Sequence, residues 1–423
     1  MNIIVFEDAG VEKLFPITTG RPAYAISCAS YRLIDWLNSF EANTVGLVRA
    51  YLDRLQLLDF PELQQELDPN LKWTIAINAR VAPSVSNIRR IQRLMGNDVG
   101  VPEAASAIKV VRSGWAIAAA IVPTEAFSGQ PTTGWLKIVE EQSNDPGTDV
   151  LENGLELFNY PHDVVAQNMK CFAENISHRI GIGDYEERFK NVFVRADVKI
   201  CDSVAFDTNS GPIVIDDGVK IGPFCYLRGP VYIGPNSKIS EHASVKDGVS
   251  ISHTCKIGGE VEGTVFESYS NKQHHGFLGH GYLGSWINLG AGTCNSDLKN
   301  TYGIVNMQYG SEKVSTGMQF VGCIIGDYAK TAINTSIFTG KVIGTGSMVY
   351  GFATTNVPSF VNYARTFGSV GDLPPEVIVT TQKRMFSRRN VPQRPVDIQL
   401  VHDMYRVTAT ERPDGLSSKP ISL

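Results

Sequence analysis

The clearest pattern in the chain is a set of aliphatic residues that recur at every sixth position. The pattern is unbroken over one long stretch: Ile215, Ile221, Leu227, Ile233, Ile239, Val245, Ile251 and Ile257. It also occurs at Val192, Val198 and Val204, at Leu283 and Leu289, and at Ile325, Thr331, Ile337, Ile343 and Val349. A strand has a period of two and a helix a period of 3.6, so neither places isolated apolar residues six apart over this length.

A three-sided coil accounts for this spacing. Each six-residue step makes a short strand and a turn, three steps complete one turn of the coil, and the aliphatic side chains stack inward. A glycine often follows the aliphatic residue, as in Ile221-Gly222 and Ile343-Gly344, because a corner needs a permissive backbone. The sequence therefore predicts a left-handed parallel β-helix over residues 191–358, interrupted at 262–282 and 294–318 by segments that leave the period. Loops on a rigid scaffold commonly carry function.

Residues 1–185 show short apolar runs that alternate with helical periodicity, which predicts an α/β domain with a mostly parallel sheet. Strands are expected at Ile3–Phe6, Thr44–Val48, Trp73–Ile77 and Trp115–Val122, and helices at Tyr31–Phe40, Ser84–Met95 and Asp163–Ile176. Residues 359–423 form a C-terminal extension. Prolines at its helix starts favour short helices at Pro375–Arg388 and from Pro395 to about Thr410, and Pro413–Leu423 is expected to be a loose tail.

Composition narrows the class of protein. The chain has 423 residues, of which 43% are hydrophobic and 19% charged, as in globular proteins of two or three domains. A net charge of −5 gives no general basic field for nucleic acid, which favours a small-molecule or protein partner. The seven cysteines include no CxxC pair, so a reducing, cytoplasmic location is expected. The sequence has no signal-like N-terminus and no long apolar stretch, so no membrane span is expected.

Two sequence segments in the predicted coil resemble those of a known family. Residues 272–279 read KQHHGFLG, and residues 283–295 read LGSWINLGAGTCN. Together they resemble the acetyltransferase half of the bifunctional N-acetylglucosamine-1-phosphate uridylyltransferase/glucosamine-1-phosphate acetyltransferase. The whole chain is similar to a group of bacterial sugar nucleotidyltransferase-like proteins whose N-terminal domain is divergent, in the phrases at 14–22, 77–81 and 270–272.

The resemblance implies acyl transfer from acetyl-CoA to an amino-sugar phosphate or nucleotide sugar. It places the general base on His274, with the adjacent His275 as a substitute, and puts Phe277 where the family has a tyrosine. The corner at Ala291 could donate a backbone N–H to the oxyanion, and Asn288 could orient the amino sugar. Three cations are candidates to bind a sugar phosphate: Arg228, Lys272 and Lys299. A lysine expected between Arg228 and the histidine has no clear equivalent at residues 262–267. Acetyl-CoA would lie along residues 320–350, and the active site would lie between the coils of a homotrimer.

The N-terminal domain departs from the pattern of nucleotidyltransferases. These enzymes usually follow their first strand with a glycine-rich loop that holds the triphosphate, plus a lysine and an aspartate that binds magnesium. Here the first strand is followed by EDAGVE, with one glycine. Asp8 could bind Mg²⁺ and Arg21 a phosphate, although a helix cap and a solvated arginine are simpler interpretations. Nucleotidylyl transfer at this domain therefore stays open.

Two other functions are compatible with the sequence. The spacing of His275 and His280, with His242 and His253 on earlier turns, is typical of γ-class carbonic anhydrases, which bind zinc through three histidines. The phrase at 288–293 fits the acyltransferase pattern better, and this alternative leaves the N-terminal domain unexplained. The other possibility is a non-catalytic protein that binds a sugar nucleotide or serves in assembly.

Overall fold

The computed structural model describes residues 1–96, 109–144, 148–152, 154–413 and 415–416. Most of the expected C-terminal tail therefore lies outside the described residues. The chain divides into two compact units. The first comprises Met1–Leu14, Arg21–Ile26 and Tyr31–Asn159, and the second comprises Phe15–Gly20, Ser27–Ser30 and Tyr160–Leu423.

The first unit is built on a mixed sheet. Its strands are β1 (Asn2–Phe6), β2 (Asn43–Leu47), β3 (Trp73–Asn78), β4 (Lys109–Ser113), β5 (Ala116–Pro123) and β6 (Asp149–Glu152). They lie in the order β2-β1-β3-β5-β4-β6. Strand β1 is parallel to β2 and β3, and β4 is parallel to β6, whereas β5 is antiparallel to both of its neighbours.

The antiparallel part of the sheet arises from a hairpin that the alternation of elements did not predict. Gly114 and Trp115 alone connect β4 to β5, and Gly114 has a φ of +57°. So short a connection forces its two strands to run antiparallel, and a positive φ is the geometry in which glycine is favoured. Trp115, expected to begin a strand, is instead a fully exposed turn residue.

The helices of this unit are α1 (Leu33–Asn38), α2 (Asp53–Asp59), α3 (Val85–Leu94) and α4 (Trp135–Ser143). Helices α1 and α3 confirm two predictions, and α2 and α4 were not predicted. Helix α3 begins after Ser84, whose side chain accepts a hydrogen bond from the Asn87 amide at 3.1 Å and so caps the first turn. Helix α4 packs Trp135 and Val139 against the apolar side chains of the sheet.

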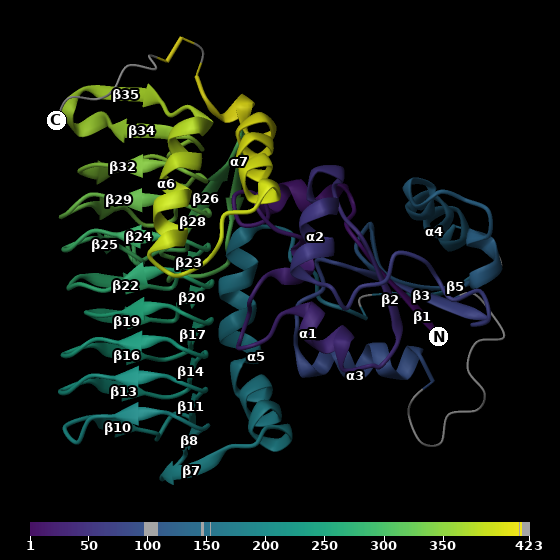
Figure 1. Ribbon diagram of the computed structural model, residues 1–423, viewed down its shortest axis with the longest axis horizontal. Helices are drawn as coiled ribbons and strands as arrows, with labels where there is room; N and C mark the ends of the chain where they lie inside the picture. The colour runs from purple at the N-terminus through teal and green to yellow at the C-terminus, as the bar shows by residue number, and fades with distance from the viewer. Residues whose placement is uncertain (97–108, 145–147, 153, 414, 417–423) are drawn as a thin grey trace. The chain divides into compact units, whose positions relative to one another are not determined.

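The second unit is a parallel coil with three faces, whose strands stack turn upon turn in Figure 1. The first face contains β8 (Val192–Val194), β11 (Ile213–Ile215), β14 (Val231–Ile233), β17 (Val249–Ile251), β20 (Val265–Phe266), β23 (Tyr282–Leu283), β28 (Cys323–Ile325) and β31 (Lys341–Ile343). The second face contains β9 (Lys199–Ile200), β12 (Lys220–Ile221), β15 (Lys238–Ile239), β18 (Lys256–Ile257), β21 (Asn271–Lys272), β24 (Asn288–Leu289), β29 (Lys330–Thr331), β32 (Met348–Val349) and β34 (Val361–Ala364). The third face contains β10 (Ala205–Asp207), β13 (Tyr226–Arg228), β16 (Ser244–Lys246), β19 (Glu260–Glu262) and β22 (Phe277–Gly279), followed by β25 (Cys294–Asn295), β30 (Ser336–Ile337) and β33 (Phe352–Ala353).

The six-residue period marks the interior of this coil, as predicted. The residues from Ile215 to Ile257 in the unbroken run are at most 2% exposed and belong to one apolar cluster. Paired strands place each of them over its equivalent one turn later, for example Ile221 over Ile239 and Ile239 over Ile257. The predicted α/β domain, parallel coil and C-terminal helices are confirmed, and the left-handed sense of the coil stays a prediction.

The segment 262–282 is not a loop, contrary to expectation. It contains parts of β19 to β23, so the coil continues through it. The inward residues here are Val261, Phe266, Lys272 and Leu278, and the first two are only five residues apart. The strict period fails because corners are shortened and because one inward position holds a lysine.

The excursion expected at 294–318 is present. After β25 the chain leaves the coil, forms the antiparallel hairpin β26 (Asn306–Tyr309) and β27 (Glu312–Ser315), and returns at β28. Antiparallel strands also close both ends of the coil, with β7 (Glu186–Phe189) on β8 and β35 (Ser369–Asp372) on β34.

Three helices complete the second unit: α5 (Pro161–Ile182), α6 (Pro375–Ser387) and α7 (Pro395–Val407). They confirm the predicted helices at these positions. Helix α6 packs Phe386 against Trp286 of the coil, with ring centroids 4.3 Å apart. Among the described residues, no helix has the length and apolar character needed to span a membrane.

Candidate functional site

Two corners of the coil bring the predicted acyl-transfer residues together. His274 and His275 lie at the corner between β21 and β22, and Ala291 lies at the equivalent corner one turn later, between β24 and β25. The Gly292 amide donates a hydrogen bond to the His275 carbonyl at 3.1 Å and joins the two corners. Both histidine side chains are exposed. The coil therefore presents an accessible imidazole beside a glycine-rich turn.

At the corner between β24 and β25, one backbone amide, that of Ala291, has no acceptor among the described residues. The amides of Gly290, Gly292 and Thr293 donate to Thr331, His275 and Gly290 carbonyls, respectively. Within the described chain the Ala291 amide has no such partner, while its carbonyl accepts from the Asn334 amide at 2.7 Å. A fixed, unpaired backbone N–H can stabilise a developing oxyanion.

Asn288 lies on the second face, where an outward residue of each short strand meets solvent. It is exposed and pairs in register with Asn271 on one side and Lys330 on the other. The Asn271 side chain accepts a hydrogen bond from Arg389 at 2.6 Å. Asn288 is thus free to contact a ligand one strand away from the histidine corner.

Lys272, predicted to contact a phosphate, instead points into the coil. It occupies the inward position over Ile257 and is 2% exposed. Its ammonium donates to the carbonyls of Gly258 at 2.9 Å and His274 at 2.8 Å. Burial lowers the pKa of Lys272 to about 8. The lysine therefore supports the histidine corner from beneath and is removed from any ligand outside.

Arg228 lies on the third face, where a partner already binds it. Its guanidinium forms an ion pair with Asp247 that includes an Nε–Oδ1 hydrogen bond of 2.8 Å. Hydrogen bonding to Asp247 raises the pKa of Arg228 further. A cation held in this way remains available to a phosphate only if the ligand competes with the carboxylate.

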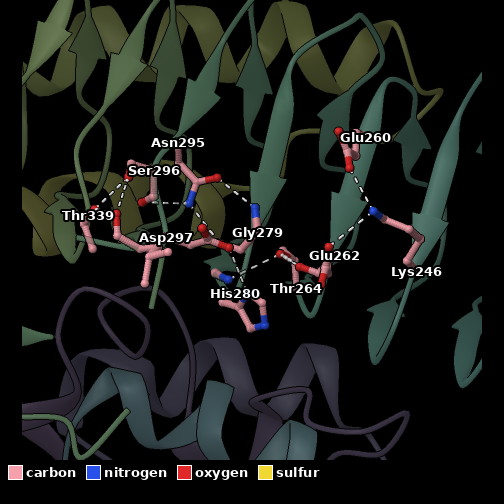
Figure 2. Close-up of polar contacts among 12 residues, drawn as sticks. Lys246, Glu260, Glu262, Thr264, Gly279, His280, Asn295, Ser296, Asp297 and Thr339 are labelled. Carbon is pink, nitrogen blue, oxygen red and sulfur yellow. Dashed lines mark hydrogen bonds and ion pairs between the residues drawn. The ribbon is translucent and has the colours of Figure 1, made fainter. Parts of the chain in front are cut away.

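Lys246 is a cation that the sequence analysis missed. It lies one turn beyond Arg228 in register. Its ammonium binds Glu260 at 2.8 Å and Glu262 at 3.3 Å (Figure 2). The missing lysine had been looked for at residues 262–267. One complete turn of this coil is three hexapeptides, so the place to look was one turn beyond Arg228.

His280, which directly follows β22, is paired with a carboxylate. Its Nδ1 lies 2.8 Å from the Asp297 carboxylate, and the two side chains are 16% and 14% exposed (Figure 2). The Phe320 ring packs 5.5 Å from the imidazole. Among the described residues, no group of three His, Cys, Asp or Glu side chains is placed to hold a metal ion.

The other predicted residues near the corner are less closely connected to it. Phe277 is half-buried on β22, and its amide contacts the Cys294 sulfur at 3.4 Å. Lys299 lies in the excursion, where its carbonyl accepts from the Tyr302 amide at 2.9 Å. In the part of the chain that the structure describes, no hydrogen bond or ion pair links Lys299 to the histidine corner.

The first unit carries charged residues at the ends of its parallel strands, where ligands of α/β sheets bind. Glu7 and Asp8 follow β1, Arg49 follows β2, and Arg80 follows β3. Glu7 is bound by Arg49 at 2.9 Å, and Asp8 by Arg80 at 2.7 Å. The carbonyl of Arg21 accepts from the Arg49 guanidinium at 3.0 Å.

These contacts do not fit a magnesium site at Asp8. Its two carboxylate oxygens accept hydrogen bonds from the Gly10 amide, the Asn78 side chain and two nitrogens of Arg80, at 2.7–3.0 Å. Metal binding requires free carboxylate lone pairs. Asp8 is instead a structural anchor for a buried arginine.

Comparisons with known proteins agree with the two-part architecture. Residues 3–181 match the family model of sugar nucleotidyl transferases, and residues 212–247 match that of the bacterial transferase hexapeptide (six repeats). The first match lies on the domain before the coil and the second lies within the coil. The chain therefore joins a sugar nucleotidyltransferase domain to hexapeptide repeats, as distant bifunctional relatives do.

Two relatives show how low the sequence identity is and how little of each chain is covered. The chain is 26% identical over 202 residues to the bifunctional sugar-1-phosphate nucleotidylyltransferase/acetyltransferase of Sulfurisphaera tokodaii, which covers 42% of this chain and 49% of that protein. It is 29% identical over 205 residues to the bifunctional protein GlmU of Methanococcus vannielii, covering 46% and 44%. The matches thus span less than half of the length of these relatives.

Solved structures of low sequence identity are also similar to part of the chain. One is the UDP-N-acetylglucosamine acyltransferase of Francisella novicida, with 13% identity, a TM-score of 0.21, and coverage of 52% of this chain and 92% of that one. Another is AntD, an N-acyltransferase from Bacillus cereus, with 14% identity, a TM-score of 0.20, and coverage of 47% and 89%.

Proposed function

We propose that the coil transfers an acyl group from acyl-CoA, in the first place acetyl-CoA, to the amine of an amino-sugar phosphate or nucleotide sugar. The proposal rests on the Ala291 amide, which has no acceptor in the described chain and lies on the turn that is hydrogen-bonded to the His274–His275 corner. An exposed imidazole and an unpaired amide on adjacent turns are the two groups that acyl transfer needs. The resemblance of both domains to bifunctional sugar transferases supports the same conclusion.

The chemistry assigns one role to each group. The amine attacks the thioester carbonyl, a C–N bond forms, and the carbonyl oxygen becomes an oxyanion that accepts a hydrogen bond from Ala291. His274 takes the proton that the amine loses. The C–S bond then breaks, and the departing thiolate receives a proton from the imidazolium. Asn288 hydrogen-bonds the acceptor sugar on the same side of the coil.

The proposed acyl donor, acyl-CoA, and the proposed homotrimer follow from the resemblance to the bifunctional acetyltransferases. Acyl-CoA would lie along the turns at residues 320–350, where apolar side chains such as Ile333 and Phe338 are 69% and 49% exposed. A second coil beside this face would complete the site, which accords with a homotrimer. Sedimentation at micromolar concentration should therefore give three times the mass of the 46.3 kDa chain.

The test is thiol release from acetyl-CoA in the presence of amino-sugar phosphates and nucleotide amino sugars. Replacing His274 by Ala should lower kcat/KM by about 100-fold or more, the usual contribution of a general base. His280→Ala is the matched control, because His280 is engaged with Asp297 on the opposite edge of the third face. Equal rates for the wild type and His274→Ala reject His274 as the base. A loss confined to His275→Ala transfers the role to its neighbour.

A second function is favoured for the N-terminal domain by one observation, the complete pairing of Asp8. We propose that this domain binds a sugar nucleotide, or serves in assembly, without transferring a nucleotidyl group. A nucleoside triphosphate with Mg²⁺ should then give no pyrophosphate in the presence of a sugar 1-phosphate. Pyrophosphate release that Asp8→Asn abolishes would restore the nucleotidyltransferase activity.

A further inference from the structure

A column of lysines runs along the second face of the coil. The strands β9, β12, β15 and β18 each consist of one outward lysine and one inward isoleucine. Their registers align Lys199, Lys220, Lys238 and Lys256 on successive turns. Neighbouring strands are about 4.8 Å apart, so the backbone positions of the four lysines occupy a line about 14 Å long.

No carboxylate of the described chain neutralises this column. None of the four lysines forms an ion pair, and like charges that face one another across strands destabilise a sheet. Helix α6 increases the charge, since Arg388 and Arg389 follow its last turn near Lys256. Burial, followed by the charges of Arg389, Arg388 and Lys238, lowers the pKa of Lys256. Burial and Arg388 likewise lower the pKa of Arg389.

The end of this column at Lys256, where Arg388 and Arg389 add further positive charge, lies near the proposed acyl-transfer corner. Above Lys256 the same outward position holds Asn271 and then Asn288, so Lys256 and Asn288 are two strand spacings, or about 10 Å, apart. Arg389 reaches this gap, because its guanidinium donates to Asn271 at 2.6 Å. Along the edge of the face, the exposed His253 imidazole packs against Tyr269 with ring centroids 5.0 Å apart.

We infer that Lys238, Lys256, Arg388 and Arg389 form a diphosphate-binding strip, and that the acceptor of the acyl group is therefore a nucleotide-linked amino sugar. This inference rests on the proposed function for the position of the amine, at Asn288. One sugar ring separates the amine from the diphosphate in such a molecule, and it fits the distance between Asn288 and Lys256. Tyr269 is stacked on Trp286 and meets His253 edge to face, so the exposed His253 imidazole is the ring that can stack on the base. A sugar monophosphate would engage fewer of these cations.

Inorganic pyrophosphate is the first probe, titrated calorimetrically into the full-length protein without any acyl donor. Binding should be detected at low salt and should weaken as ionic strength rises. Lys256→Ala and Arg389→Ala should each weaken it by about tenfold or more, as expected for the loss of a charge-assisted hydrogen bond. The matched control is Lys199→Ala, at the far end of the same column, which should change the affinity by less than about twofold. Uridine diphosphate should bind more tightly than pyrophosphate, and His253→Ala should remove that advantage.

The outcomes separate this inference from the proposed function. Absence of pyrophosphate binding, or equal losses in Lys256→Ala and Lys199→Ala, overturns the strip as a specific site. If His274-dependent acyl transfer proceeds while pyrophosphate does not bind, the strip alone is rejected. If pyrophosphate binds as described but thiol release depends on neither His274 nor His275, the proposed function is rejected and the strip stands. Equal melting temperatures of the three variants exclude unfolding as the cause of a loss.

Discussion

The two units of this protein differ in how their charged side chains are paired. At the ends of the parallel strands in the first unit, Glu7 and Asp8 are each bound by a buried or nearly buried arginine. On the second face of the coil, lysines are aligned without any carboxylate in ion-pair range among the described residues. The charges of the first unit are paired within the protein, whereas the aligned lysines of the coil are open to solvent and to an anionic ligand. The proposed ligand contacts therefore lie in the coil.

The largest expected effect tests the structural character of the first-unit pairs. Asp8→Ala leaves Arg80, whose side chain is 4% exposed, without its carboxylate. Removing one partner of a buried ion pair typically costs about 3–5 kcal/mol, because the other charge stays buried. We expect a loss of about 3 kcal/mol in the free energy of unfolding, measured by urea denaturation.

The control for this prediction is an exposed pair in the same unit. Lys137 and Glu141 lie 3.5 Å apart on α4, with 78% and 62% of their side chains exposed. Glu141→Gln should change stability by less than about 0.5 kcal/mol. A comparably small effect of Asp8→Ala would show that the first-unit charges are not structural, and the contrast between the units would fail.

The next prediction concerns Lys272, a buried cation of the coil. The pKa of Lys272 is lowered to about 8 from 10.5, so the unfolded chain binds more protons than the folded one between these values. Stability should therefore rise with pH from about 8 to about 10.5, by up to about 3 kcal/mol relative to Lys272→Met. Denaturation of both proteins at pH 7.5 and pH 10 measures the difference. A constant difference would mean that Lys272 does not titrate in this window.

A smaller effect is expected from a buried amide that is fully paired. Asn295 occupies an inward position of the coil, where its side chain accepts from the Gly279 amide at 2.8 Å and donates to the Gly279 carbonyl at 2.9 Å (Figure 2). Asn295→Ala leaves both backbone groups without these bonds, and a cost of about 2 kcal/mol is expected. Its exposed neighbour Ser296 provides the control, since Ser296→Ala should cost less than about 0.5 kcal/mol. Equal melting temperatures for the two variants would contradict this account.

The smallest effect should come from the paired charges of the third face. Lys246 binds two carboxylates, but Glu260 has 49% of its side chain exposed. Glu260→Gln should therefore lower the free energy of unfolding by less than about 1 kcal/mol, and salt should reduce even that difference. An effect as large as that of Asp8→Ala would show that this face, too, depends on internal pairing.

The sequence predicted the coil well because its signal is local and repeated. An inward residue must be apolar in nearly every step, so Ile215 and its successors reveal the period without any knowledge of distant contacts. The six-residue apolar period failed as a predictor where an inward position is not apolar. Lys272 takes an inward position because its ammonium finds two backbone carbonyls, a solution that the pattern of apolar residues cannot disclose.

The candidate site was predictable in part for a related reason. The motif placed His274 and Ala291 on adjacent corners correctly, since residues about one turn apart in a coil are neighbours. The pairing of Asp8 with Arg80 joins residues 72 positions apart through the fold of the first unit, and no sequence period reports it. Lys246 could have been found by counting one turn from Arg228 instead of searching the nearest residues.

The two-residue strands of the second face have one more consequence. Each turn adds a single outward side chain there and advances it by one strand spacing, about 4.8 Å. Inserting or deleting one whole turn would therefore change the distance between the lysines and the histidine corner in a fixed increment, without rotating either around the axis. A ligand that bridges the proposed strip and the histidine corner would therefore have its length set by the number of turns between them.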